Sequence, residues 1–381
     1  MEFGIGLSNY PGCWDDVAFA EQHGFSTAGF FDTPLISGDP FVSLAMAAAR
    51  TSTIKLGTLL NIPSMRSAPV TATAIASINH LAPGRVFFAT GTGYTGRATF
   101  GLKPMAVSQV VDHIQEVRGL LAGLEVRHRH GRQESSIRVA NPEYLGNNLE
   151  NPIPIYLAAD GPLALKAAGE HAEGWITTLQ NGSEIGTGGA MGNVPEVFAA
   201  SLATVRASAA ASGRSYDDAF TSWTTSMCVL EPGESAVSPR ALQQVGPFAM
   251  FAFHSYACNP EIKAFLPPAM RDRVEIYEKE VLSRFDVPRD RLYQVVHAGH
   301  LDHLLDGEAA VLTEEIVRMM SLTGTPKEIA AQLHQLENAG MKCLTLNIPR
   351  PIFREVVLDV EEKIAPLLAP AAVNAGIPET A

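Results

Sequence analysis

The chain alternates short runs of consecutive apolar residues with longer segments in which apolar residues recur every three or four positions. The short runs predict β-strands, and the longer segments predict amphipathic helices. We expect strands at residues 3–7, 27–31, 54–60, 85–90, 153–158, 174–178, 220–229 and 341–348. We expect helices at residues 14–23, 39–50, 69–81, 106–121, 162–171, 195–211, 325–339 and 355–368. The seventh of these helices begins with a capping-box pattern, Thr325 to Glu328.

The predicted strands are apolar throughout, which is typical of a parallel sheet covered on both faces. Eight strand–helix units in one chain favour an α/β fold of the (β/α)8 (TIM) barrel type over an open sheet. Residues 1–369 then form a single domain, and 370–381 a flexible tail. Insertions at about 125–151 and 231–322 interrupt the units, the first as a surface hairpin and the second as an aromatic, helical segment without a strand. Both lie at the C-terminal face, where the functional loops of such a barrel gather.

Composition and charge exclude several classes of protein. With 46% hydrophobic and 18% charged residues, the chain is neither disordered nor a coiled coil. No apolar run is long enough to span a membrane, and the first residues do not form a secretory signal, so we expect a cytoplasmic protein. A net charge of −12 argues against nucleic-acid or anionic-membrane partners. The four cysteines lie far apart and contain no CxxC pair, so we expect no structural zinc.

Two loops that follow predicted strands carry candidate binding chemistry. Residues 91–96 match G-x-G-x-x-G, but they follow the fourth strand rather than the first, which disfavours a dinucleotide-binding fold. In a barrel, Gly91, Thr92 and Gly93 would instead let backbone N–H groups approach a ring or a phosphate.

The second loop opens a helix at residues 158–162. Ala158, Ala159, Asp160 and Gly161 would place a cofactor phosphate at the amino end of that helix, where free N–H groups and the helix dipole favour an anion. The alternative is an ordinary helix start capped by Asp160.

The second insertion holds the candidate catalytic residues. Its aromatic residues either form a subunit interface or cover the barrel mouth as a lid and substrate wall, and we favour the lid. His254 and His300 are then the polar groups expected to face the substrate, although a satisfied buried histidine is an alternative for His254. The sequence His297-x-x-His300-x-x-His303 suggests a metal triad, but no carboxylates accompany it and the spacing spreads the rings, so we predict no metal site.

Five segments of the chain resemble the luciferase-like flavin and deazaflavin oxidoreductases, in the order found in that family. They are residues 57–63 with Arg66 and Pro69, 85–93, 99–104, 153–161 with 168–169 and 172–174, and 322–326 with 339–340. The third segment is similar to the methylenetetrahydromethanopterin reductase branch. The resemblance covers the chain except for the two insertions.

The resemblance implies a barrel, usually a homodimer, that binds FMN or the deazaflavin F420 at the carboxyl ends of the strands. It implies a bulge, often with a non-prolyl cis peptide, at Leu59, Leu60 and Asn61 behind the isoalloxazine ring. Asp32 matches the acid that ends the second strand and could bond the cofactor. Relatives that oxidise sugar phosphates carry His and Glu where this chain has Thr33 and Tyr94, so that chemistry is in doubt.

Our first interpretation is a two-component monooxygenase that uses reduced FMN and O2 on a small organic substrate. A separate flavin reductase would supply the FMN, because no NADH-binding domain remains once the barrel is assigned. The alternative is F420-dependent hydride transfer without oxygen. A third interpretation, a non-catalytic flavin-binding protein, explains the long apolar insertion less well.

Overall fold

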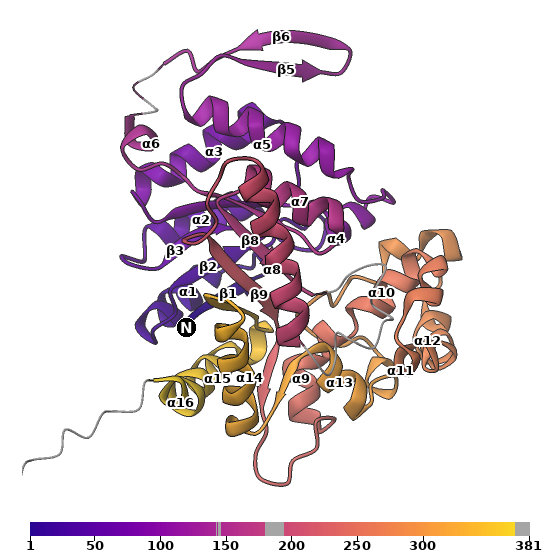
Figure 1. Ribbon diagram of the computed structural model, residues 1–381. Helices are drawn as coiled ribbons and strands as arrows, with labels where there is room; N and C mark the ends of the chain where they lie inside the picture. Colours follow the sequence, from indigo (N-terminus) through magenta and orange to yellow (C-terminus); the bar gives the residue numbers. More distant parts are fainter. Residues whose placement is uncertain (142, 144–145, 180–193, 370–381) are drawn as a thin grey trace, which may run out of the picture.

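Eight parallel strands close into a barrel in the computed structural model of the chain, in the order β1-β12-β9-β8-β7-β4-β3-β2 (Figure 1). The structure describes residues 1–141, 143, 146–179 and 194–369. The barrel strands are β1 (Glu2–Leu7), β2 (Thr27–Phe30), β3 (Lys55–Thr58), β4 (Val86–Thr90), β7 (Ile155–Ala158), β8 (Gly174–Thr177), β9 (Phe220–Thr225) and β12 (Cys343–Asn347). The predicted (β/α)8 barrel is therefore confirmed.

Helices follow the strands and form the outer layer of the barrel. They are α1 (Cys13–Gln22), α2 (Pro40–Ala48), α3 (Ala68–Leu81), α5 (Val107–Leu121), α7 (Pro162–His171), α8 (Val194–Ala211), α14 (Pro326–Asn338), α15 (Phe353–Asp359) and α16 (Ala365–Leu368). The predicted capping box is present, because the Thr325 hydroxyl accepts from the Glu328 N–H while Glu328 accepts from the Thr325 N–H.

The last predicted helix, residues 355–368, is not continuous. A π-helical turn at Val360–Ile364 separates α15 from α16. Pro366 lies in the first turn of α16. It has no N–H, and its ring crowds the carbonyl four residues earlier, so the α-helical ladder cannot run through this point.

A layer of large side chains fills the barrel beneath its mouth. Its members are Phe31, Leu59, Phe87, Ala89, Tyr156 and Ile176. Tyr156 stacks between Phe87 and Phe220, with ring centroids 5.2 and 4.7 Å apart. Gly57 makes room for this layer, since a Cβ there would lie 2.4 Å from the Phe87 ring. The layer gives the cavity above it a closed apolar floor.

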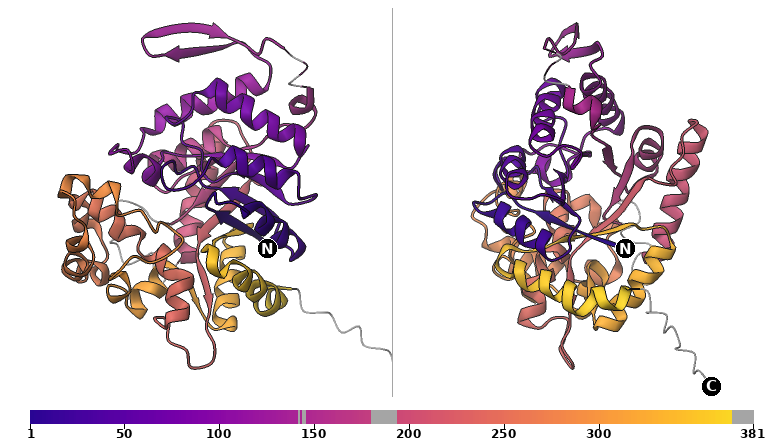
Figure 2. Two further views of the ribbon diagram at one scale, coloured as in Figure 1. Left: turned by 180° about the vertical axis from the view of Figure 1, so that it is seen from behind. Right: turned by 90° about the vertical axis from the view of Figure 1, so that its left-hand side faces the viewer.

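The first insertion forms the predicted hairpin, of β5 (Val126–His130) and β6 (Gln133–Ile137), followed by α6 (Gly146–Glu150). Its predicted place at the C-terminal face is wrong, because it joins the end of α5 to the start of β7 and so lies at the amino-terminal ends of the strands. The hairpin projects from the barrel at the top of Figures 1 and 2, well away from the second insertion. The predicted tail, residues 370–381, lies outside the described residues. No helix among the described residues combines the length and the hydropathy needed to cross a bilayer.

The second insertion is a helical subdomain packed beside the barrel mouth (Figure 2). It contains α9 (Pro239–Ala249), α10 (Phe251–Cys258), α11 (Pro268–Arg271), α12 (Val274–Glu280) and α13 (Glu314–Met320), with 3-10 turns at Pro260–Phe265, Leu282–Arg284, Arg289–Gln294 and Glu308–Ala310. It has an apolar core of its own, which includes Phe253, Tyr277 and Ile316. This core lets the insertion hold a fixed surface against the barrel.

A short strand that the sequence did not predict begins at the last residue of the second insertion. β11 (Leu322–Gly324) pairs in parallel with β10 (Met227–Val229) outside the barrel. The predicted strand 220–229 accordingly divides into β9 and β10 at Ser226, whose hydroxyl donates to the Asn347 carbonyl at 2.9 Å.

Candidate functional site

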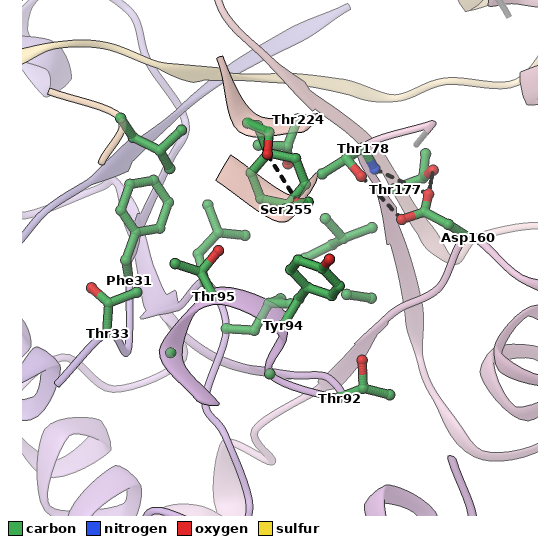
Figure 3. Close-up of a pocket in the computed structure, with 18 of the residues that line it drawn as sticks. Phe31, Thr33, Thr92, Tyr94, Thr95, Asp160, Thr177, Thr178, Thr224 and Ser255 are labelled. Atoms are coloured by element: carbon green, nitrogen blue, oxygen red, sulfur yellow. Dashed lines mark hydrogen bonds between the residues drawn. The ribbon is translucent and has the colours of Figure 1, made fainter. Parts of the chain in front are cut away.

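A cavity of about 510 Å³ lies at the carboxyl ends of the barrel strands (Figure 3). Its floor is the apolar layer inside the barrel, one side is formed by the loops that follow β3, β4 and β7, and the opposite side is formed by the second insertion. Of the residues predicted from sequence, those that line it are Asp32, Leu59, Leu60, Thr92, Gly93, Ala158, Asp160, Gly161 and His300. This volume is typical of a small-molecule or cofactor site.

A backbone bulge after β3 forms the inner wall of the cavity. The Leu59–Leu60 peptide bond is cis, as the resemblance implied, and both side chains line the cavity. Asn61 lies behind them: its N–H donates to the Ala89 carbonyl at 2.8 Å, and its carbonyl accepts from the Thr90 hydroxyl at 3.0 Å. Asn61 therefore ties the bulge to β4, whereas we predicted it to contact the cofactor.

Asp32, at the end of β2, is fixed from below by the same bulge. One carboxylate oxygen accepts from the Asn61 amide at 3.2 Å and from the Ile62 N–H at 3.1 Å. Burial raises the pKa of Asp32, while the Ile62 bond, Arg66 and the Asn61 bond act in the opposite direction. Asp32 thus presents a carboxyl group in a mainly apolar wall.

The glycine loop after β4 leads into α4 (Tyr94–Ala98), a short helix that we did not predict. Gly93 has a φ of 75°, and a Cβ there would lie 2.5 Å from Ile62. Gly91 does not line the cavity, because a Cβ there would meet the Leu60 side chain at 2.8 Å. We expected these glycines to make room for a ring, but they make room for the bulge and its neighbour, and Gly93 also permits the turn.

The amino end of α7 opens into the cavity. Gly161 is its N-cap residue. Among the described residues, no side chain caps the helix, and a Cβ at Gly161 would meet nothing within 4 Å. Asp160 does not cap the helix, so that alternative is wrong. Its carboxylate instead accepts from the Thr178 N–H and hydroxyl at 3.2 and 3.0 Å, from the Leu179 N–H at 3.1 Å and from the Thr177 hydroxyl (Figure 3).

Ala159, predicted to contact the phosphate, lies beneath this loop. It is buried, and its carbonyl accepts from the Trp175 indole N–H at 2.7 Å. The remaining free donors at the helix end, together with the unobstructed space above Gly161, form an anion-binding position of the kind that a cofactor phosphate occupies.

The second insertion supplies an aromatic wall, as expected for a substrate wall. Phe248, Phe251 and Phe265 line the cavity, and the Phe251 ring lies 5.8 Å from that of Tyr94. His300 also lines it. His254, which we predicted to face the substrate, does not: it is buried behind the wall, with Nε2 2.6 Å from a Glu308 carboxylate oxygen.

Several polar residues that line the cavity were not predicted from the sequence. Thr178, Thr224 and Asn347 lie at or just beyond the carboxyl ends of β8, β9 and β12. The Thr224 hydroxyl is buried and has no partner in the part of the chain that the structure describes, so it can bond a ligand. Polar residues at the ends of otherwise apolar strands were the signal that could have identified them. Among the described lining residues there is no lysine or arginine, so the floor and walls suit a neutral ring.

Comparison with known proteins identifies the family to which the chain is similar. A family model described as luciferase-like monooxygenase matches residues 15–343. The 5,10-methylenetetrahydromethanopterin reductase of Methanolobus tindarius is 25% identical over 345 residues, which cover 87% of this chain and 88% of the relative. The F420-dependent hydroxymycolic acid dehydrogenase of Mycobacterium tuberculosis is 30% identical over 149 residues, which cover 37% of this chain and 40% of the relative.

A solved structure shares the fold over nearly the whole chain. It is the coenzyme F420 dependent tetrahydromethanopterin reductase from Methanopyrus kandleri, with a TM-score of 0.66 and 19% identity. The match covers 96% of this chain and 98% of the other.

Proposed function

Because the chain belongs to the luciferase-like monooxygenase family of oxidoreductases, we propose that it binds F420 and transfers a hydride between this cofactor and a small, neutral organic substrate. The observation that carries the proposal is the cavity at the barrel mouth. It joins a flat apolar backing, Leu59 and Leu60, to the uncapped amino end of α7 at Gly161. A ring and a phosphate need these two environments.

The described residues fit such a cofactor. Leu59 and Leu60 would pack on one face of the ring, while the unpartnered Thr224 hydroxyl and Asp32 offer polar contacts at its edge. The donors at the start of α7 would hold the phosphate. When bound, F420 supplies the hydride acceptor or donor, and the protein supplies orientation and exclusion of water.

The wall from the second insertion supports a small substrate of low polarity. Phe248, Phe251 and Phe265 would pack against it. The hydroxyl groups of Thr178 and Ser255, which donate to Asp160 and to the Phe251 carbonyl, could accept a hydrogen bond from a substrate hydroxyl or amine group. The cavity offers no cationic side chain among its described lining residues, and Thr33 and Tyr94 replace the His and Glu of sugar-phosphate-oxidising relatives. This pattern argues against a phosphorylated or carboxylated substrate.

F420 is preferred over FMN because the named relatives include F420-dependent enzymes. The FMN-dependent monooxygenase that the sequence first suggested is the second candidate, supported by the description of the family itself. In that case a separate flavin reductase would be a partner. We also propose that the protein is a homodimer, as the resemblance implies.

The experiment is a binding comparison followed by an anaerobic reaction. The purified protein is titrated with F420, reduced F420, FMN and reduced FMN, and the dissociation constants are compared. We expect F420 in one redox state to bind at least tenfold more tightly than either form of FMN. We then expect the visible absorbance of F420 to change without O2 when a panel of small alcohols, ketones and imines is added. Tighter binding of reduced FMN, with O2 uptake coupled to product, would contradict the proposal and favour the monooxygenase.

A further inference from the structure

Three buried histidines meet behind the insertion wall. His254 comes from α10, and His297 and His300 come from the turns that follow the Arg289–Gln294 segment. The three residues are only 2%, 4% and 6% exposed. One ring nitrogen from each lies within 4.8 Å of the others. The His254–His297 and His297–His300 ring centroids are 5.6 and 5.5 Å apart, and both ring pairs are nearly perpendicular.

Each of these rings has a buried nitrogen without a partner. The Nδ1 atoms of His254, His297 and His300 make no hydrogen bond within the described structure. Buried polar atoms are normally paired, because leaving one unpaired costs about 1–3 kcal/mol. Three rings this close together, each with an unpartnered nitrogen, offer the donor atoms of a metal site.

The opposite edges of two of the rings are already held. His254 Nε2 lies 2.6 Å from Glu308 Oε1, and the other Glu308 oxygen accepts from the Leu305 N–H at 2.8 Å. His297 Nε2 lies 3.5 Å from the Cys258 sulfur. A histidine that binds a metal through one nitrogen commonly has its other nitrogen oriented by a carboxylate in this way.

We propose that His254, His297 and His300 bind one divalent transition-metal ion of the zinc class, with Glu308 orienting His254 and balancing part of the charge. Imidazole nitrogens suit zinc, cobalt and nickel ions. Bonds of about 2.0–2.1 Å place tetrahedral ligand atoms roughly 3.4 Å apart, so the rings must approach by about an ångström. The ion ties α10 to the turns around His300 and so fixes the wall of the substrate cavity.

The site differs from the sequence motif that first suggested one. His303, the third histidine of the 297–303 repeat, is exposed, with 57% of its side chain accessible, and its ring contacts Asp302 at 3.4 Å. The repeat therefore supplies only two of the three proposed ligands, His297 and His300. His254, more than forty residues earlier in the sequence, completes the set.

The test uses the full-length protein stripped with a chelator and needs no cofactor. Zn²⁺ is added back, bound zinc is counted by elemental analysis after dialysis, and affinity is measured by calorimetry. We expect one zinc per chain. His297→Phe and His300→Phe keep a flat ring without a ligand atom, and each should weaken zinc binding at least tenfold. His303→Phe is the matched control and should bind zinc like the unmodified protein.

A second measurement tests the proposal even if the histidine variants fail to fold. Co²⁺ added to the stripped, unmodified protein should give the intense visible bands of a four-coordinate site, without the near-ultraviolet band of a cobalt–thiolate bond. Less than a tenth of an equivalent of retained zinc, or an equal loss of affinity in His303→Phe, would overturn the proposal. A failure of F420 binding would leave the zinc result unchanged, so the two proposals can fail separately.

Discussion

His113 shows how one buried side chain makes stability depend on pH. It lies on α5 and faces Phe88 of β4, with ring centroids 6.3 Å apart. Its Nε2 has no hydrogen-bond partner among the described residues. Burial alone lowers its pKa to about 4. Between pH 6.5 and 4 the unfolded chain therefore binds a proton that the folded protein does not, and stability falls as the pH falls through this window.

We expect His113→Phe to remove this dependence. The difference in unfolding free energy between the variant and the unmodified protein should increase by about 2 kcal/mol from pH 8 to pH 5. Only the unmodified protein loses this stability, because residue 113 of its unfolded chain binds a proton that the folded protein does not. Urea unfolding at both pH values measures the difference. A constant difference between the two proteins across this range would show that His113 titrates normally in the fold.

At the same scale, the sequence predicted where the site lies but not which way every side chain points. Asp32, Gly93, Asp160 and Gly161 were found because they end apolar strands or begin helices. Asn61 and Ala159 lie one layer further back than the lining residues beside them, because successive residues at a strand end can face opposite sides. Thus Ala159 lies behind Ala158. Which residue of each such pair faces the cavity depends on sheet register, which a single sequence does not fix.

The amino end of α7 is the element on which phosphate binding depends. Gly161 has extended backbone angles, with a φ of −88°, and open space around its missing Cβ, so a larger side chain can be added without a clash. We expect Gly161→Glu to fold normally but to lose cofactor affinity at least tenfold, because it places a carboxylate where the phosphate binds.

The control for this prediction is Gly161→Gln, which has the same size without the charge. It should lose much less affinity than Gly161→Glu in the same titration. Equal affinities for Gly161→Glu and the unmodified protein would place the phosphate elsewhere.

The second insertion should lose order independently of the barrel. Phe253 is fully buried in the core of the insertion, where its ring lies 5.3 Å from that of Tyr277. Phe253→Ala leaves a cavity that costs about 3–5 kcal/mol. We expect hydrogen exchange to accelerate at the amides of α10 and α12 while the barrel strands keep their protection. Uniform acceleration across the chain would show that barrel and insertion unfold together.

The accuracy of the sequence predictions varied with the length of the element. The barrel strands and long helices carry enough apolar periodicity to stand out, so all eight strand–helix units were predicted. α4 has five residues and β11 has three, too few for a periodic pattern. β10 and β11 also pair across more than ninety residues, and local sequence does not indicate such a contact.

At the scale of the molecule, the hairpin of β5 and β6 is separate from the site. Most of its residues are exposed, and it contacts α5 through Val126, which packs on Gly119, and through His128, whose Nδ1 lies beside a Glu116 carboxylate oxygen. We expect replacement of residues 126–137 by a short Gly-Ser linker to change the melting temperature by only a few degrees and to leave cofactor affinity unchanged.

Size-exclusion chromatography of that deletion variant adds a second result. If the variant still elutes at the volume expected for a dimer of its own mass, the hairpin has no part in the proposed homodimer. A large loss of cofactor affinity would contradict the separation of hairpin and site.

The architecture of the whole chain followed from the sequence because eight similar units can close in few ways. The arrangement of the second insertion did not, since its position depends on contacts between residues distant in the chain. His254 illustrates this: the apolar residues around it predicted burial, but only the folded insertion shows Glu308 and His297 beside it.

The indole of Trp175 has an optical consequence. It is fully buried in β8 and bonded to the carbonyl of Ala159, directly beneath the loop at the amino end of α7. Flavins and deazaflavins absorb light in the range where a buried tryptophan emits, and energy transfer over such a short separation is efficient. Cofactor binding should therefore dim the intrinsic emission of the protein, and Trp175→Phe should reduce that change, with the buried Trp223 of β9 contributing the rest. The chain carries its own reporter for the occupancy of the cavity.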